Sequence, residues 1–266
     1  MKFSVIIPAW NEGPAVGRSL KRLREVSDSS TMELILVDGG STDGTAAAAE
    51  PWVDRIVRLD APNRGAQLHA GAKVATGDLF FFLHADTQPP SQWQERLEKF
   101  WLKDRAEPAA ASVFSVDYGT RLSYRLVAAA QNMRTRVLQI AYGDQGFCTT
   151  ADIYRKSGGF PELPLMEDVE FSRRLRALGR IELLPDPIWP SARSLSARGL
   201  VLYALRNRWL VLRYSMGADP AALWKNYYAL RLQTPPPAPV ETAKGHPFAG
   251  KFRRRTPAPA PPERSA

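Results

Sequence analysis

His84 and Asp86 are the first residues whose types and spacing suggest chemistry. They follow five large apolar residues at 79–83, which predict a strand buried on both faces of a sheet. Ligands bind at the carboxyl ends of strands in open α/β sheets, where a carboxylate beside an imidazole could hold a divalent metal or a sugar hydroxyl. The residues alone equally allow Asp86 to cap a helix that begins near Ser91.

Polar residues also follow three earlier predicted strands. The strands are predicted at 3–7, 33–37 and 56–59, and the polar residues after them are Asn11, Glu12, Asp38, Asp43 and Arg64. Loops that follow parallel strands meet at one edge of the sheet, so we expect these side chains to cluster with Asp86. Asp38 could accept hydrogen bonds from a base or a ribose, and Asp43 fits a helix cap slightly better. Arg64 either pairs with a phosphate or caps a turn.

The elements that must position these residues alternate regularly. Four strand–loop–helix units occupy roughly the first ninety residues, which predicts an α/β fold with a doubly wound, mostly parallel sheet and helices on both faces. Further along, the pattern predicts a strand over 111–118, an amphipathic helix over 122–137 and a helix that starts near 169 and ends at Gly179.

The composition bounds the class of protein and its compartment. At 266 residues and 44% hydrophobic, the chain is long enough for one large α/β domain or two small ones. Its single cysteine, Cys148, excludes an internal disulfide, and no export signal or membrane span is apparent, so we expect a cytoplasmic protein.

Charge is concentrated at the end of the chain. Residues 234–266 hold six basic residues, two acidic residues and nine prolines, so they supply +4 of the net charge of +9. This composition predicts a disordered basic tail. The mild excess elsewhere suits a phosphate-bearing substrate, and we expect no nucleic-acid partner.

Four ordered sequence blocks resemble a known enzyme family. They are residues 5–12 (VIIPAWNE), 37–45 (VDGGSTDGT), 63–65 (NRG) and 83–87 (LHADT). Together they resemble the inverting family 2 glycosyltransferases, which have the GT-A fold, over roughly the first 185 residues. The resemblance implies a nucleotide-sugar donor, expected to be a UDP-sugar, with Mn²⁺ or Mg²⁺ bound at Asp86. The donor-binding residues that it implies are Pro8, Ala9, Asn11, Glu12, Asp38, Gly40, Arg64, Gly65, His84, Ala85 and Asp86.

His84 departs from the family pattern. The metal motif of the family is usually Asp-x-Asp, and His84 occupies the place of the first aspartate. That carboxylate usually faces the ribose or a metal-bound water, so an imidazole could replace it while Asp86 remains the ligand. Alternatively, a neutral His84 fills space at the edge of the sheet.

Glu167 and Asp168 lie at the start of the last predicted helix. On the residues alone, two carboxylates there complement the helix dipole and nothing more. The resemblance implies that Asp168 is the catalytic base and that Glu167 orients the site or the acceptor. Inversion by direct displacement needs a carboxylate that takes the acceptor proton and a metal that stabilises the departing diphosphate. Asp144 and Gln145 fit an acceptor pocket, with a tight structural turn as the alternative.

The expected activity is transfer of one sugar by a hexosyltransferase-like enzyme to a hydroxyl or carboxyl acceptor. The alternatives are a non-catalytic nucleotide-sugar binder and, less well supported, a sugar nucleotidyltransferase. Within the family, the blocks around 83–87, 143–146 and 158–170 resemble a short bacterial subfamily associated with arsenosugar biosynthesis. They also resemble the carotenoid glycosyltransferases that act on diaponeurosporenoate.

We expect one glycosyltransferase domain over 1–233. It comprises a donor half to about 110, an acceptor and base half over 111–185 and C-terminal helices over 195–233, followed by the tail at 234–266. Residues 199–214 are rich in Leu, Val, Tyr, Trp and Arg. This stretch fits either a helix packed on the domain, which we favour, or peripheral contact with the inner face of the cell membrane. The basic tail would share in that contact, which would suit a lipid-like acceptor.

Overall fold

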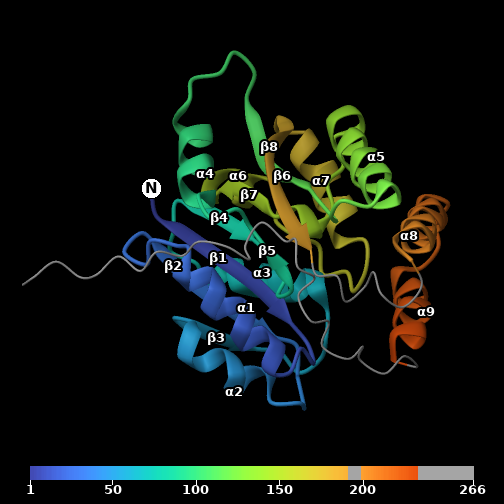
Figure 1. The fold of residues 1–266 in the computed structure, drawn as a ribbon, viewed down its shortest axis with the longest axis horizontal. Helices are drawn as coiled ribbons and strands as arrows, with labels where there is room; N and C mark the ends of the chain where they lie inside the picture. The colour runs from blue at the N-terminus through green and yellow to red at the C-terminus, as the bar shows by residue number, and fades with distance from the viewer. Residues whose placement is uncertain (191–198, 233–266) are drawn as a thin grey trace, which may run out of the picture. The chain divides into compact units, whose positions relative to one another are not determined.

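The computed structural model describes residues 1–190 and 199–232. Within these residues an eight-stranded sheet has the order β3-β2-β1-β4-β7-β6-β8-β5 (Figure 1). Four of the seven neighbouring strand pairs are parallel, whereas β7 runs antiparallel to β4 and β6, and β5 runs antiparallel to β8. The strands are β1 Phe3–Ala9, β2 Met32–Asp38, β3 Arg55–Arg58, β4 Leu79–Phe82, β5 Thr87–Gln88, β6 Ala109–Val116, β7 Phe147–Thr150 and β8 Arg180–Pro190.

Helices cover both faces of this sheet, as the alternating pattern predicts. On one face α1 and α4 contribute Leu20 and Trp93 to the core. On the other face α3 and α7 contribute Leu68 and Phe171. The helices are α1 Pro14–Glu25, α2 Thr45–Ala49, α3 Arg64–Val74, α4 Trp93–Leu102, α5 Leu122–Leu138, α6 Ala151–Lys156, α7 Glu167–Arg176, α8 Leu200–Ser215 and α9 Pro220–Leu232, with short 3₁₀ turns η1 Glu50–Trp52 and η2 Gly143–Gln145.

Strand β4 explains the apolar run at 79–83. Leu79 and Phe81 belong to the core on one face of the sheet, and Phe80 and Phe82 belong to the core on the other. All four side chains are at most 2% exposed. Because β4 is buried on both faces, it is held firmly within the sheet. Its carboxyl end therefore sets the position of the loop at 84–86.

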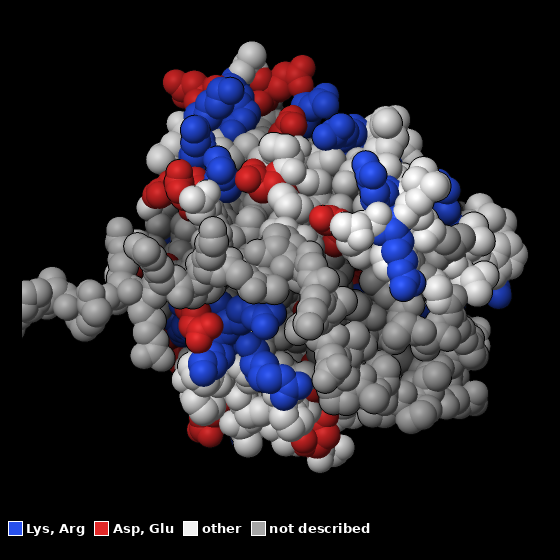
Figure 2. Space-filling view, in the orientation of Figure 1, with Lys and Arg blue, Asp and Glu red and all other residues white. Residues whose placement is uncertain are grey.

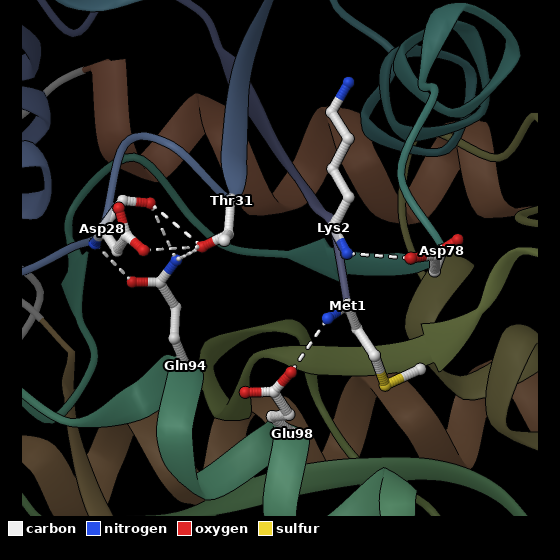
Figure 3. A network of polar contacts seen from close by, with 7 residues as sticks. All are labelled: Met1, Lys2, Asp28, Thr31, Asp78, Gln94 and Glu98. Atoms are coloured by element: carbon white, nitrogen blue, oxygen red, sulfur yellow. Dashed lines mark hydrogen bonds and ion pairs between the residues drawn. The ribbon is translucent and has the colours of Figure 1, made fainter.

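Polar contacts fix the amino ends of β1 and β4 (Figure 3). The amino group of Met1 donates to Oε1 of Glu98 in α4 at 2.8 Å. The backbone N–H of Lys2 donates to Oδ2 of Asp78, just before β4, at 2.8 Å. These contacts hold the two parallel strands in register at the end opposite to their site-bearing loops.

Strand β8 lies where the sequence predicted none. It contains Pro185, Pro187 and Pro190, and proline removes the backbone donor that a strand needs. A register irregularity between Phe114 and Ser115 of β6 accommodates the prolines, because the partner in β8 advances from Leu184 to Pro187 there. The strand therefore depends on tertiary pairing that the local pattern does not reveal.

Helix α5 forms where it was predicted, but its apolar stripe does not face the core. Leu122, Leu126, Met133 and Val137 are 57–71% exposed. The buried residues of the helix are Ala128 and Thr135 instead. The sequence thus located the helix correctly, whereas the orientation of its apolar face emerges only in the fold.

The C-terminal helices α8 and α9 pack against the segment that leads into α7. Leu210 and Leu223 are buried with Leu165, Met166 and Val169. No helix in the described ranges is long and apolar enough to cross a membrane. The tail predicted at 234–266 lies outside the described residues, as do 191–198 and 233, so the domain boundaries stay predictions.

Candidate functional site

The loops after β1 and β2 meet at one edge of the sheet. Ala9 and Asp38, the last residues of these parallel strands, lie opposite each other. The backbone N–H of Asn11 donates to Ser41 Oγ at 2.9 Å, and Thr42 N–H donates to Asn11 Oδ1 at 3.0 Å. These contacts bring together six of the predicted donor-binding residues, namely Pro8, Ala9, Asn11, Glu12, Asp38 and Gly40.

Asp38 is held in a fixed position at this edge. Its side chain is 4% exposed, and Oδ1 accepts hydrogen bonds from the backbone N–H and the hydroxyl of Ser41. Gln67 of α3, which the sequence did not single out, donates through Nε2 to the carbonyls of Ala9 and Val37, both at 2.9 Å. Since Gln67 is buried, it ties α3 to the ends of β1 and β2.

Asp43 contacts the start of α2, although the N-cap of this helix is Gly44. Its Oδ1 accepts hydrogen bonds from the backbone N–H and the hydroxyl of Thr45, in the first turn of α2, at 3.1 and 2.5 Å. Thr45 Oγ1 in turn accepts from the backbone N–H of Glu12 at 2.9 Å. Asp43 therefore supports the loop that carries Glu12.

Two residues with side chains adopt the left-handed backbone conformation within the predicted site. Asn11 has a φ of 51°, and Met166, which directly precedes Glu167, has a φ of 70°. Such conformations cost on the order of 1 kcal/mol and persist where the surrounding structure imposes them. Their places in the donor loop and before the predicted base agree with the tendency of backbone strain to gather at functional sites.

Arg64 and Glu167 form an ion pair that joins the two halves of the chain. Arg64 Nη1 lies 3.0 Å from Glu167 Oε1, although 103 positions separate the residues. Glu167 is 1% exposed. Burial raises the pKa of the Glu167 carboxyl to about 7, while Arg64 opposes that shift and the neighbouring Asp168 adds to it. Arg64 is therefore already engaged by a protein carboxylate.

The start of α3 lies against the loop at 161–163. Gly65 N–H donates to the Leu163 carbonyl at 3.1 Å, and a Cβ on Gly65 would lie 1.9 Å from the Pro161 carbonyl oxygen. Asn63 caps the helix by accepting from Ala66 N–H at 3.0 Å. Glycine is required at position 65 because the chain passes too close for any side chain.

Asp86 does not cap a helix, and that interpretation is wrong. Helix α4 begins at Trp93 with Gln92 as its N-cap, and β5 lies between. Asp86 is half-buried, and no hydrogen bond or ion pair within the described ranges engages its carboxylate. Carboxylate oxygens of this kind suit a hard divalent cation. No group of three or more His, Cys, Asp or Glu in the described part of the chain could hold a metal, so the protein would supply few of the ligands.

His84 faces a narrow cavity beside the predicted base. The cavity is lined by Leu68, Phe82, His84, Gly143, Phe147, Phe160, Glu167 and Asp168, and its free interior of about 10 Å³ is close to the space of one water molecule. A Cβ on Gly143 would lie 2.3 Å from His84 Nε2, so the ring packs directly on that residue. His84 thus links the loop after β4 to the loop that contacts Asp168, while Asp86 does not line the cavity.

Asp168 occupies the first turn of α7 and keeps an accessible carboxylate. Its Oδ2 accepts a hydrogen bond from Gly143 N–H at 3.1 Å, and its Oδ1 accepts one from Val169 N–H at 2.8 Å. The side chain is half-buried, unlike that of Glu167. A carboxylate at the amino end of a helix, with its oxygens held by backbone N–H groups, has the position and chemistry that a general base requires.

Asp144 and Gln145 are engaged by protein groups. Asp144 accepts hydrogen bonds from Tyr118 at 2.9 Å and Gln131 at 2.8 Å, and burial raises the pKa of its carboxyl against these contacts. Gln145 is fully buried, and its Oε1 accepts from the Thr135 hydroxyl at 2.8 Å. This arrangement does not support direct contact of Gln145 with an acceptor. It agrees instead with the alternative of a structural turn that fixes Gly143.

Comparison with known sequences decides the family. The family described as Glycosyl transferase family 2 matches residues 4–158, more than half of the chain. The chain belongs to glycosyl transferase family 2. The match covers the loops after β1, β2, β3 and β4 and ends before Glu167 and Asp168.

Curated proteins of this family match parts of the chain. An undecaprenyl-phosphate 4-deoxy-4-formamido-L-arabinose transferase of Serratia proteamaculans is 37% identical over 107 residues, which are 37% of this chain and 33% of that protein. A probable glycosyltransferase, YdaM, of Bacillus subtilis is 25% identical over 248 residues, 80% of this chain and 57% of that protein. This chain therefore spans between about a third and rather more than half of these relatives.

Solved structures of glycosyltransferases share the fold. A mannosyltransferase of Pyrobaculum calidifontis in complex with GDP-Man and Mn²⁺ has a TM-score of 0.61 at 20% identity and covers 85% of this chain and 69% of its own. Glucosyl-3-phosphoglycerate synthase of Mycobacterium tuberculosis, in complex with Mn²⁺ and UDP, has a TM-score of 0.51 at 21% identity and covers 78% and 79%. At these identities the likeness establishes the GT-A-like α/β fold alone.

Proposed function

We propose that this family 2 protein transfers one sugar from a nucleotide-diphosphate sugar, preferably a UDP-sugar, to an acceptor hydroxyl or carboxyl with inversion at the anomeric carbon. The observation that carries the proposal is the position of Asp168. The Asp168 side chain at the amino end of α7 lines the same cavity as His84, which comes from the loop after β4. The strand-end loops that match the family and the predicted base thus adjoin.

In the proposed site the donor lies over the ends of β1 and β2. Asp38 faces the nucleoside, with Pro8, Ala9, Asn11 and Glu12 forming the wall beside it. The fixed hydrogen bonds of Asp38 and Gln67 support this role, since they pre-organise the edge before a ligand arrives. Gly40, Gly65 and Ala85 complete the proposed donor site, although a Cβ on Gly40 or Gly65 would meet a protein carbonyl oxygen, that of Asp60 or of Pro161.

Asp86 is the proposed ligand of Mn²⁺ or Mg²⁺. Hard divalent cations in nucleotide sites take one or two protein carboxylates and complete their shell with phosphate oxygens and water, which fits a single available carboxylate. When bound, the cation would neutralise charge on the departing diphosphate. Complexes of two related folds with Mn²⁺ support this choice of cofactor.

Asp168 takes the acceptor proton as the acceptor oxygen attacks the anomeric carbon and the bond to the diphosphate breaks. Gly143 N–H fixes one carboxylate oxygen for this purpose. Glu167 acts as a positioning residue, because its buried carboxylate holds Arg64 at the edge of the donor site. Arg64 contributes positive charge next to the diphosphate from that place.

For the acceptor, we propose a molecule that offers a hydroxyl or a carboxyl group. The sequence blocks favour the arsenosugar-associated subfamily or the transferases of carotenoid acids. We also propose that the protein transfers one sugar per encounter and acts in the cytoplasm. Peripheral membrane contact through residues 199–214 would suit a lipid-like acceptor. Asp144 and Gln145 support the acceptor side through the loop at Gly143.

One observation favours a second candidate, a nucleotide-sugar binder without catalysis. His84 replaces the usual first carboxylate of the metal motif. Within the described residues, Asp86 also belongs to no group of three or more His, Cys, Asp or Glu that could hold a metal. Such a binder would hold the nucleotide sugar without needing a metal and would release no nucleotide diphosphate from it. The sugar nucleotidyltransferase is disfavoured because residues 8–13 lack the expected Gly-rich basic loop.

A donor screen tests the proposed activity. Purified full-length protein is incubated with UDP- and GDP-sugars, Mn²⁺ and a library of soluble and lipid-like acceptors, and released nucleotide diphosphate is measured. We expect Asp168→Asn to lower the release by at least about a hundredfold, in the range of general base catalysis, with nucleotide binding retained. Glu170→Gln, in the same helical turn, is the matched control and should retain activity. Equal release by wild type and Asp168→Asn would overturn the role of Asp168.

A further inference from the structure

Helices α5 and α8 expose a set of large apolar side chains that the fold leaves uncovered. On α5 these are Leu122, Leu126, Met133, Val137 and Leu138, and on α8 they are Leu202, Leu205, Trp209 and Leu212, followed by Met216. Each is 50–71% exposed. The two helices pack against each other at one side of the molecule (Figure 1). Large exposed apolar sets of this kind mark interaction surfaces.

The spacing shows that each helix presents its apolar residues as a stripe. On α8 positions 202, 205, 209, 212 and 216 follow intervals of three and four, and on α5 positions 122, 126, 133 and 137 follow intervals of four, seven and four, which keep them on one side of the helix. The packing side of α8 contributes Leu210 to the buried cluster with Met166 and Val169. The exposed stripe is therefore a second apolar side of α8, in addition to its packing side.

Within α5 and α8 themselves the charged residues have one sign, whereas Asp219 follows α8 and Glu170 lies beside Tyr214 of α8. Residues 118–143 contain four arginines and no acidic residue, and α8 contains three arginines and no acidic residue. Arg125 and Arg136 on α5 and Arg208 and Arg213 on α8 are exposed. Figure 2 shows blue and white side chains over the region that α5 and α8 occupy at the right of Figure 1. Apolar stripes on two helices whose own charged residues are all arginines match an anionic lipid surface.

We propose that α5 and α8 form one docking surface for an anionic lipid bilayer. The apolar stripes enter the boundary between headgroups and acyl chains, and the arginines pair with lipid phosphates. This surface adds α5, which the sequence indicated only as an amphipathic helix, to the contact proposed for 199–214. The purpose of this surface rests on the proposed function. Helix α8 shares a buried cluster with Met166 and Val169, which lie on either side of Glu167 and the predicted base Asp168.

Charge favours this occupant over a second copy of the chain. A symmetric dimer would place the same surface on both partners, so exposed arginines would face arginines without any carboxylate from α5 or α8 to pair with. An anionic bilayer supplies the missing negative charge.

Vesicle flotation tests the surface without measuring catalysis. The full chain is mixed with vesicles of phosphatidylglycerol and phosphatidylcholine or of phosphatidylcholine alone. We expect wild type to float with the anionic vesicles, and Leu126→Glu/Met133→Glu and Leu205→Glu/Trp209→Glu each to weaken this binding at least about tenfold. Leu102→Glu, at an equally exposed leucine on α4, is the matched control and should float as wild type does.

A charge series separates these helices from other basic segments. Arg125→Glu/Arg136→Glu should weaken flotation, whereas Arg18→Glu/Arg22→Glu on α1, with the same change in net charge and the same exposed class, should alter it much less. Circular dichroism and thermal unfolding confirm that the variants fold. The proposal is overturned if wild type does not float, if flotation survives in the α5 and α8 variants, or if the chain forms a dimer that these substitutions dissociate and does not bind vesicles. Loss of flotation with sugar transfer to a soluble acceptor intact supports the surface and leaves the proposed activity standing.

Discussion

Two adjacent acidic residues at the start of α7 differ in environment and therefore in role. Glu167 is buried and paired with Arg64, whereas Asp168 is half-buried and held by Gly143 N–H. The sequence placed both at a helix start, and the family resemblance assigned Asp168 as the base. The sequence could not predict that Arg64 is the partner of Glu167, because that pairing depends on the tertiary fold. Gln67 was missed for the same reason, since nothing local shows that it faces the ends of two strands.

The raised pKa of Glu167 predicts a pH-dependent contribution to stability. The folded state holds its proton up to about pH 7, whereas the ordinary value is 4.5, so the folded state binds this proton more tightly than the unfolded state. The contribution of this group favours folding below pH 4.5 and is lost as the pH rises to about 7. Glu167→Gln removes that dependence. Urea unfolding from pH 4.5 to 7.5 should show wild type losing stability relative to the variant as the pH rises, and identical pH profiles would contradict the raised pKa.

At the scale of elements, hydrophobic periodicity located most of the first four strands and the helices between them. The signal is strong there because β1, β2 and β4 are buried on both faces, which gives continuous apolar runs, and because their helices bury one side, which gives a helical period. Strand β8 escaped prediction because its prolines suggest a loop, and β6 tolerates them through an irregular register. The exposed side of α5 was also not predictable, since periodicity finds a stripe but not what covers it.

The contact between α3 and the loop at 161–163 predicts a strong effect of Gly65→Ala. The new Cβ would lie 1.9 Å from the Pro161 carbonyl and 2.9 Å from Leu163 N, so one segment has to move. We expect a loss in the free energy of unfolding of about 1–3 kcal/mol. Denaturant unfolding measures it, with Lys73→Ala on the exposed side of the same helix as the control. A variant as stable as wild type would show that the two segments do not pack as closely as described.

For the whole molecule, the sequence predicted a doubly wound, mostly parallel α/β sheet with helices on both faces, and the fold agrees. The narrow cavity at Asp168 was not predictable, because it forms among residues from α3, β4, β7 and α7 that lie far apart in the chain. Asp144 and Gln145 suggest an acceptor pocket in sequence but are occupied by protein contacts in the fold.

Cys148 reports on the integrity of the whole core. It is the single cysteine of the chain, is 0% exposed in β7, and burial raises the pKa of its thiol to about 12. We expect iodoacetamide to leave native protein unmodified and to label one thiol per chain in urea. The labelling rate in the native state should follow global unfolding, so fast modification of native protein would contradict a closed core around β4 and β7.

In the proposed site a nucleotide diphosphate and a divalent cation meet at Asp86. Calorimetric titration of UDP, with GDP in parallel, with Mn²⁺ and with chelator tests this directly. We predict that Mn²⁺ tightens nucleotide binding to wild type at least about tenfold, or 1.4 kcal/mol, and that Asp86→Asn loses this gain while the exposed Asp152→Asn retains it. Binding that is equally tight without metal in all three proteins, or no binding of either nucleotide, would contradict the central claim.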